Sequence, residues 1–193
     1  MSFLKRVLGP SWVISGKQHL DRLFPRRPRV RIAKTALIHN RDAIVFGENC
    51  EIGDFVVLNP FVGLIEIGIN TQVNYFSVIS SGSGVKIGDN VMIGPHVMIA
   101  GGNHEFRNLQ LPMRLAGSFS KGPIVIENDV WIGANSTILD GVKVSEGCVV
   151  GAGSVVTRST EPYGIYGGCP ARKIGSRLEF GSPPPKADRR VES

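Results

Sequence analysis

The sequence lacks long apolar runs, paired cysteines and a large share of aromatic residues. No apolar run approaches the roughly 20 residues that a membrane-spanning helix requires. The three cysteines have no paired spacing, which excludes a disulfide framework and the usual zinc motifs. Free cysteine is usually buried, so Cys50 and Cys148 are expected to fill the core. With 24 glycines and 7% aromatic residues, the composition favours a turn-dense fold over a helical bundle.

Three functional signals are also missing. The net charge is +6, but no recognition helix or RNA-binding motif accompanies it, so no nucleic-acid partner is predicted. No G-x-S-x-G nucleophile elbow is present. Pro10 splits the N-terminal apolar patch and no small-residue cleavage site follows, so no signal peptide is expected and the predicted location is cytoplasmic.

What the sequence does contain is an aliphatic residue at every sixth position along most of its length. Such a period must be interpreted before local secondary structure. Two or three extra residues separate the early triplets, and the last series is unbroken. The positions are Ile52, Leu58, Ile67, Val73, Ile79, Ile87, Ile93, Ile99, Ile126, Ile132, Ile138, Val144, Val150 and Val156, with the aromatic Phe46 at the head of the series.

Two more columns share this period. Glycine often follows the aliphatic residue, and we expect it there because the backbone turns at φ values that other residues resist. These glycines are Gly47, Gly53, Gly68, Gly88, Gly94, Gly133 and Gly151. Small or β-branched residues stand four places after the aliphatic one and are predicted to point inward with it. They are Cys50, Val56, Val62, Thr71, Ser77, Val91, Val97, Val130, Ser136, Val142, Cys148 and Ser154.

A period of six fits neither an amphipathic helix nor a simple alternating strand. It fits a coil of three short strands, in which each face uses six residues and a full turn uses eighteen, the spacing from Ile126 to Val144. Successive turns then stack as parallel strands, and the ends of the stack need caps. Parallel crossovers are right-handed in about 98% of cases, and the spacing alone does not override that rule.

Three segments, 130–138, 150–157 and 167–174, together resemble the hexapeptide-repeat acyltransferases. They read VWIGANSTI, VGAGSVVT and GGCPARKI. Within the family, they are most similar to the branch of sugar O-acetyltransferases and xenobiotic acetyltransferases. The resemblance covers roughly residues 44 to 175.

The resemblance implies an all-β fold, a left-handed parallel β-helix that is an exception to the handedness rule, with an N-terminal cap and a protruding active-site loop. It also implies a homotrimer with active sites between subunits, and acetyl-coenzyme A as the acyl donor. We expect an N-terminal cap or arm at residues 1–31, the β-helix at 32–175, and a partly disordered tail at 176–193.

The repeat is interrupted at length directly after His104. Residues 105–125 leave the period before Ile126 resumes it. Loops longer than about 12 to 15 residues are usually functional or disordered. This loop is too apolar for a solvated linker, so we expect it to fold over a neighbouring subunit or a ligand. Its apolar residues are Phe106, Leu109, Leu111, Met113, Leu115 and Phe119.

By resemblance, His104 stands where the family branch carries its general base. Acyl transfer from a thioester to a hydroxyl needs a group that removes the hydroxyl proton during attack, and neutral imidazole suits this role. The thioester is already activated, so no covalent enzyme intermediate is required. The alternative is that His104 only caps the corner of the β-helix through hydrogen bonds.

Asn74 matches the position where the sugar-acetylating branch places an asparagine near the acceptor. Its amide could orient a hydroxyl or a carbonyl oxygen for attack. The alternative is a corner residue that replaces glycine, because asparagine tolerates left-handed backbone.

The resemblance also places the donor in a groove along the β-helix. Small residues let the pantetheine arm approach the backbone, and cationic side chains suit the phosphates. The implied cofactor-binding residues are Ala134, Ala152, Thr157, Arg158, Arg172 and Lys173. Trp131 is a further candidate that could line the groove or simply pack on the solenoid.

Two departures from the family pattern concern the oxyanion stabiliser. Cys169 replaces the frequent asparagine before Pro170, and Ala134 lacks the hydroxyl that some members place near the thioester. A backbone N–H group is therefore the expected stabiliser.

The other histidines are assigned structural or solvent-exposed roles: His19 in the cap, His39 before the clean repeats and His96 at an outward corner. The same fold supports carbonic anhydrases with three zinc-binding histidines, two of them five apart. His96 and His104 are eight apart, so no metal site is predicted.

These observations predict an O-acetyltransferase that acts on a sugar or surface-polysaccharide precursor. Two rivals stay open, an antibiotic acetyltransferase and a catalytically silent scaffold. The apolar and basic N-terminal segment, residues 3–31, is expected to cap the first coil, with contact to a membrane surface as the alternative.

Overall fold

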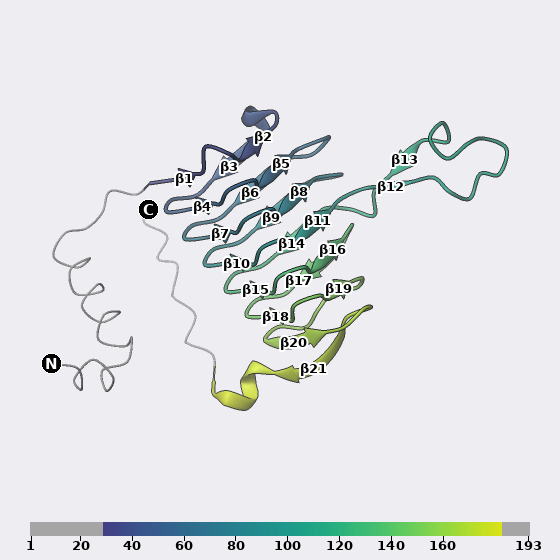
Figure 1. Ribbon diagram of the computed structural model, residues 1–193. Coiled ribbons are helices and arrows are strands. Elements are labelled where there is room, and N and C mark those ends of the chain that lie inside the picture. Colours follow the sequence, from purple (N-terminus) through teal and green to yellow (C-terminus); the bar gives the residue numbers. More distant parts are fainter. Residues whose placement is uncertain (1–28, 183–193) are drawn as a thin grey trace, which may run out of the picture.

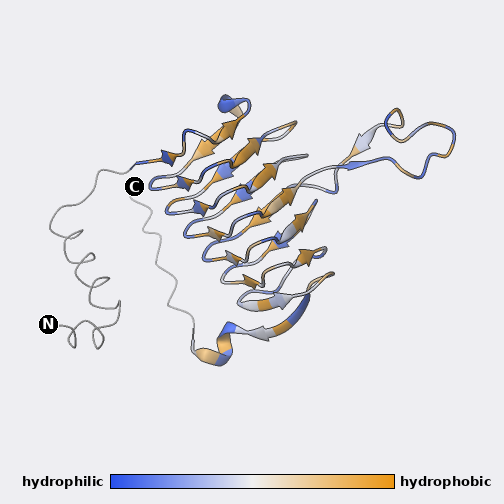
Figure 2. Cartoon of the chain, viewed as in Figure 1, coloured by the Kyte–Doolittle hydropathy of each residue, from blue (hydrophilic) through white to orange (hydrophobic). Residues whose placement is uncertain are grey.

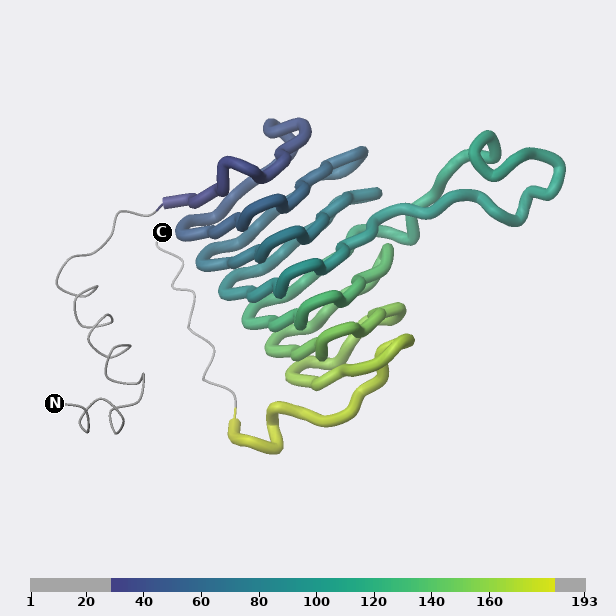
Figure 3. Tube along the Cα trace, in the orientation of Figure 1, coloured from purple at the N-terminus to yellow at the C-terminus, as the bar shows by residue number. Residues whose placement is uncertain are grey.

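The computed structural model describes residues 29–182, which form a left-handed parallel β-helix (Figure 1). The chain winds through three faces per coil, and the coils stack with their strands in register (Figure 3). The prediction of an all-β solenoid is therefore confirmed. No helix in this range is long and apolar enough to cross a membrane.

The three faces differ in the number of strands that they contain, and each is named by that number. The eight-stranded face consists of β1 (Arg31–Ile32), β4 (Glu51–Ile52), β7 (Gln72–Val73), β10 (Met92–Ile93), β15 (Trp131–Ile132), β18 (Val149–Val150), β20 (Gly164–Gly167) and β21 (Arg172–Ser176). The six-stranded face consists of β2 (Leu37–Ile38), β5 (Val57–Asn59), β8 (Val78–Ser80), β11 (Met98–Ala100), β16 (Thr137–Leu139) and β19 (Val155–Val156). The five-stranded face consists of β3 (Ile44–Phe46), β6 (Ile65–Ile67), β9 (Val85–Ile87), β14 (Ile124–Ile126) and β17 (Lys143–Val144).

Within residues 29–182, four further elements lie outside these faces. Strands β12 (Asn103–His104) and β13 (Ser118–Phe119) form an antiparallel hairpin, and two 3-10 helices, η2 (Arg41–Ala43) and η3 (Arg177–Phe180), lie near the two ends. Strand β21 runs antiparallel to β20 and closes the C-terminal end of the stack. Of the expected cap at 1–31 only residues 29–31 are described, and of the expected tail at 176–193 only residues 176–182; the remainder lies outside the described residues.

The core is an apolar column of side chains inside the coils. Hydrophobic residues recur on the strands of successive coils (Figure 2). The aliphatic positions from Ile52 to Val156 are at most 2% exposed, as predicted. Phe46 is half-buried, with the Arg41 guanidinium 4.6 Å from its ring centre. Cys50 and Cys148 are fully buried, which confirms them as core residues. The prediction for Val62 is wrong: its side chain is 77% exposed, because the extra residues between β5 and β6 form a wider turn.

Three corners join the faces. The first corner connects the eight- to the six-stranded face, the second the six- to the five-stranded face, and the third the five- to the eight-stranded face. Left-handed backbone recurs there at the third residue after the aliphatic one. These residues are Asn49, Phe55, Asn70, Phe76, Asn90, His96, Gly102, Asp129, Asn135, Gly141, Gly147 and Gly153.

Stacking of like side chains supports these corners. At the first corner, Phe55, Phe76 and His96 form a column with successive ring centres 5.0 Å apart and nearly parallel planes. At the third corner, the Asn49 amide donates to Asn70, and the Asn70 amide donates to Asn90, each over 3.2 Å. Phenylalanine seldom adopts positive φ. The ring stacking between coils therefore stabilises a backbone conformation that Phe55 and Phe76 would not favour by themselves.

The glycines that follow the aliphatic column are required for a different reason than the one predicted. None of the seven has positive φ in the described backbone. Instead, a Cβ atom on Gly68 would lie 2.5 Å from the carbonyl carbon of Gly88, and one on Gly133 would lie 2.5 Å from the Ala152 nitrogen. The absent side chain therefore allows adjacent coils to approach each other.

This close approach predicts unequal costs for alanine within one column. Gly68→Ala is expected to lower the free energy of unfolding by about 1 to 3 kcal/mol, because the added methyl overpacks against backbone. At Gly151 the nearest atom to a new Cβ is the backbone carbonyl oxygen of Tyr166 at 3.4 Å, which is an ordinary van der Waals contact. Gly151→Ala is the matched control and should be nearly neutral. Urea titration of both variants measures the difference, and equal losses would contradict this explanation.

Candidate active site at the hairpin

The interruption of the repeat is a hairpin that leaves the solenoid at the second corner, between β11 and β14 (Figure 1). It projects away from the chain's own coils (Figure 3). Most of its apolar side chains are therefore exposed, from Leu111 at 48% to Leu109 at 90%. The expected contact of this loop with a neighbouring subunit or a ligand stays a prediction.

An ion pair stabilises the arms of the hairpin near its base. Arg107 pairs with Glu105 over 2.7 Å, and its guanidinium lies 5.5 Å from the centre of the Phe119 ring on the opposite arm. The hydrogen bond from Arg107 lowers the pKa of Glu105 to about 2. The first arm is thereby linked to the second beyond the short β12–β13 ladder.

His104 lies at the base of this hairpin, in β12, opposite Ser118 of β13. Its side chain is exposed, and no hydrogen-bond partner of its imidazole is present in the part of the chain that the structure describes. Its backbone, in contrast, belongs to a paired strand. The imidazole is therefore accessible while its backbone is held in place. Among residues 29–182, no hydrogen bond supports the alternative that it caps the corner.

Asp140, which the sequence reasoning did not single out, holds the base of the hairpin. It is 6% exposed and follows β16 at the second corner. Its carboxylate accepts hydrogen bonds from Gly102 N and Asn103 Nδ2 on one arm and from Ser120 Oγ and Lys121 N on the other, over 2.5 to 2.8 Å. Burial alone favours the neutral acid, but these hydrogen bonds outweigh it and lower the pKa of Asp140.

Asn74 directly follows β7 at the first corner and is half-buried. It occupies the column of Gly53, Gly94 and Gly133, so it does replace glycine. Its φ is not positive, however, and the explanation by left-handed backbone is wrong. Both its backbone N–H and its side-chain Nδ2 donate to the carbonyl of Ile93, each over 3.0 Å. That bond fixes the amide and leaves its second N–H as a donor and its oxygen as an acceptor.

Ala134 and Ala152 lie one above the other at the first corner, in successive coils. The carbonyl of Ala134 accepts a hydrogen bond from Gly153 N over 2.8 Å. Ala152 is exposed, so its small side chain leaves the backbone of this corner open. Trp131 is 51% exposed in β15 of the adjoining eight-stranded face, between Met92 and Val149. It is a surface side chain on the solenoid.

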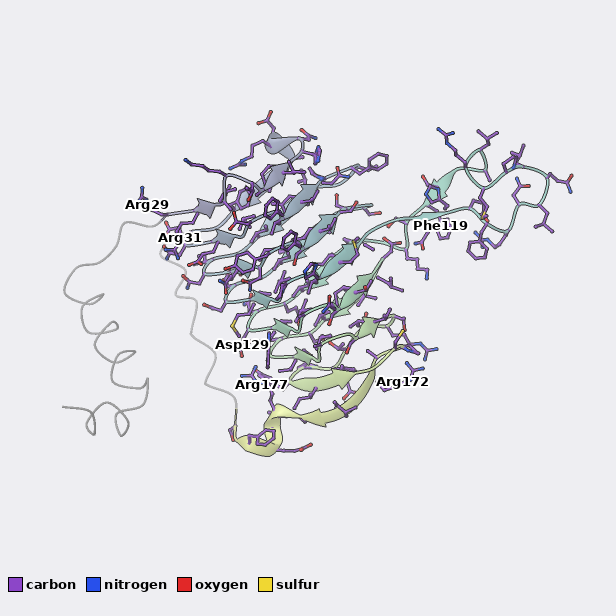
Figure 4. All side chains as sticks on the ribbon, viewed as in Figure 1. Arg29, Arg31, Phe119, Asp129, Arg172 and Arg177 are labelled. Atoms are coloured by element: carbon purple, nitrogen blue, oxygen red, sulfur yellow. The ribbon has the colours of Figure 1, made fainter. Side chains whose placement is uncertain are left out.

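The four remaining predicted residues lie towards the C-terminal end. Thr157 and Arg158 follow β19 at the second corner and are exposed. Arg172 and Lys173 are exposed in β21. Figure 4 shows Arg172 at the C-terminal end of the stack, well away from Phe119 of the hairpin. Lys173 pairs with Glu161 over 2.6 Å, whereas Arg172 bonds the carbonyl of its own neighbour Ala171.

The predicted site residues therefore form two groups in one chain. His104, Thr157 and Arg158 lie along the second corner. Asn74, Ala134 and Ala152 lie along the first corner. Strand β21 begins next to this corner: Ala171, the residue before it, donates its backbone N–H to the carbonyl of Val155, where the chain leaves the corner. The six-stranded face separates the two corners. One chain does not bring His104 and Asn74 together.

The histidines offer no metal cluster within residues 29–182. His96 stacks on Phe76 at the first corner, whereas His104 lies at the second. No group of three or more His, Cys, Asp and Glu side chains in this range has the arrangement of a metal site. His39 is exposed next to β2, and His19 lies outside the described residues.

Comparison with known proteins agrees with this architecture. A family model described as the hexapeptide repeat of succinyl-transferase matches residues 123–158. A protein of Escherichia coli (strain K12), WbbJ, named as a lipopolysaccharide biosynthesis O-acetyl transferase, is 35% identical over 162 residues, covering 80% of this chain and 82% of that one. A hexapeptide-repeat acetyltransferase of Vibrio cholerae, solved in complex with acetyl-coenzyme A, has a TM-score of 0.61 and 36% identity. That alignment covers 69% of this chain and 70% of the other.

A shorter match is to an enzyme named for an antibiotic. The chain is 50% identical over 57 residues to a chloramphenicol acetyltransferase of Klebsiella aerogenes, which is 30% of this chain and 27% of that protein. The chain thus spans only about a quarter of that relative. The match to WbbJ, in contrast, extends over four fifths of both proteins. On this similarity and on its coiled architecture, the chain belongs to the hexapeptide-repeat acyltransferase family.

Proposed function

We propose that this protein transfers acetyl from acetyl-coenzyme A to a hydroxyl of a sugar or surface-polysaccharide precursor. The observation that carries the proposal is the exposed imidazole of His104, without a hydrogen-bond partner among residues 29–182, at the base of an apolar hairpin. The similarity to an O-acetyl transferase over most of the chain supports the reaction class. The soluble donor suits the predicted cytoplasmic location.

His104 acts as the general base in this proposal. Its imidazole nitrogen takes the proton of the acceptor hydroxyl as that oxygen attacks the thioester carbonyl carbon, and the carbon–sulfur bond breaks. The proton then passes to the departing thiolate. A backbone N–H group stabilises the negative charge that develops on the carbonyl oxygen. The second N–H of the Asn74 amide, which Ile93 does not engage, donates to the attacking hydroxyl oxygen and orients it.

The exposed residues of the two corners suit the donor. Ala152 leaves backbone accessible to a pantetheine arm, and Trp131 offers a flat apolar surface beside it. Arg158 and Arg172 are exposed cations without a carboxylate partner in the described chain, so they are free to meet phosphates. Thr157 adds a hydroxyl group as a hydrogen-bonding partner. Lys173 would release its ion pair with Glu161 and bind a phosphate of the donor in its place.

A homotrimer would unite the two groups, because the second corner of one copy could meet the first corner of the next. The outer surface of the six-stranded face supports such packing. Its outward side chains, including Val57, Val78 and Met98, are uncharged, whereas the five-stranded face carries Glu66 and Lys86. His104 and Asn74 of one site would then come from different copies.

Release of free thiol from acetyl-coenzyme A, measured with a panel of sugars, nucleotide sugars and antibiotics, tests the proposal. We expect release only with a saccharide acceptor. Release with chloramphenicol or a streptogramin instead would support the second candidate, an antibiotic acetyltransferase, which the shorter match to a chloramphenicol acetyltransferase favours. Absence of coenzyme A binding in calorimetry would reject both and indicate a scaffold.

A further inference from the structure

The base of the hairpin depends on one buried carboxylate. Asp140 belongs to the coil that follows the hairpin, and Leu139 beside it pairs with Ala100, the last residue of β11. The carboxylate therefore lies directly below the point where the chain leaves the solenoid. Each oxygen accepts from both arms, Oδ1 from Gly102 N and Ser120 Oγ, Oδ2 from Asn103 Nδ2 and Lys121 N.

The charge of Asp140 matters for this arrangement. A carboxylate offers only acceptors, and hydrogen bonds to an ionised group are stronger than those between neutral groups. The four donors also stabilise the charged form against burial, so the group stays ionised as long as the pH remains above its lowered pKa. The neighbouring coil has no equivalent, since the corner position one coil further on, Arg158, is an exposed cation.

We infer that Asp140 is a positioning residue for His104, an inference that rests on the proposed function of His104 as the base. His104 immediately follows Asn103, whose amide bonds Asp140 Oδ2, and it pairs with Ser118, two residues before Ser120. The carboxylate ties both arms to the rigid coil and so fixes where the imidazole stands. It acts through the hairpin and does not touch the reacting atoms.

The main test is Asp140→Asn, which keeps the size of the side chain but replaces one oxygen with an amide NH₂. One pair of donors then faces another donor and loses its acceptor. We expect faster hydrogen exchange of the backbone amides at residues 102–121 and a kcat reduced about 10- to 100-fold, because small misplacement of a reacting group carries costs of this order. The Kd for coenzyme A should stay within about twofold of the wild-type value, because the carboxylate acts on the hairpin and not on the donor.

Two further variants separate positioning from general stability. Ser120→Ala removes one donor and should give a smaller change in the same direction. Ser145→Ala is the matched control, because its hydroxyl is also buried and donates to Thr160 O over 2.7 Å, but it does not touch the hairpin. That variant should lower the Tm without altering kcat or hairpin exchange.

A double-mutant cycle then isolates the route of action. In a His104→Ala background, adding Asp140→Asn should leave the residual rate unchanged, and a further loss comparable to that in the wild type would overturn the inference. Unchanged hairpin exchange in Asp140→Asn would overturn it as well, and this measurement needs no acceptor. If His104→Ala is inactive while Asp140→Asn is fully active, the positioning role of Asp140 is wrong and the proposed function stands. If His104→Ala is fully active, the proposed role of His104 as the base is wrong, and the inference about Asp140 falls with it.

Discussion

Replacing His104 with alanine is expected to lower kcat by about two to four orders of magnitude, the usual contribution of a general base. The imidazole is exposed and makes no hydrogen bond within residues 29–182, so its removal breaks no hydrogen bond in this range. The Tm and the Kd for coenzyme A should therefore stay close to those of the wild type. Steady-state thiol release with the best acceptor measures the loss.

His39→Ala is the matched control for this experiment. His39 is also an exposed histidine, but it lies near the N-terminal end of the six-stranded face, where its backbone N–H bonds Leu58 O. Its replacement should leave kcat unchanged. Wild-type turnover in a folded His104→Ala variant would refute the assignment of the base.

Ile138→Ala is expected to lower the free energy of unfolding by about 2 to 5 kcal/mol. Ile138 is fully buried in β16, where it pairs with Ile99 above and Val156 below. Its truncation leaves a cavity that the rigid coils cannot close, because close-packed interiors relax only in part. Urea titration at a fixed protein concentration measures the loss, since assembly would make stability depend on concentration.

A graded series makes the prediction about Ile138 specific. Ile138→Val removes a single methylene and should cost about 0.5 to 1.5 kcal/mol. Val45→Ala, at a side chain that is 57% exposed in β3, should remain within about 0.5 kcal/mol of the wild type. If the buried and exposed truncations cost the same, the six-residue column does not form the stabilising core.

The fold follows from the sequence because a coil of this kind repeats its contacts at a constant separation. Ile126 to Val144 is one turn, so the period alone places the residues that stack. The prediction was wrong where the period was locally broken. Val62 lies among extra residues between two triplets, and a corner turn of unusual length turned its side chain outward. For the glycine column, the positions were correct but the reason was not, since close approach of the coils is visible only in three dimensions.

The candidate site was predictable only in part. His104 could be identified because it borders the interruption, but Asp140 could not. Asp140 is followed by Gly141, and this pair of residues is typical of an ordinary turn. Its hydrogen-bond partners Gly102 and Lys121 lie 38 and 19 positions away in the sequence. Only the stacking of coils brings these segments together. The separation of His104 from Asn74 was equally hidden, because it depends on which corner each residue occupies.

The coils on either side of the hairpin pair as if it were absent. Strand β11 matches β16, and β14 matches β9, each without a shift in register. Chain length between two fixed ends adds little entropic cost, about 0.6 kcal/mol for each doubling. The hairpin is therefore a modular insert, which can be lengthened, shortened or exchanged while the coils on either side keep their pairing.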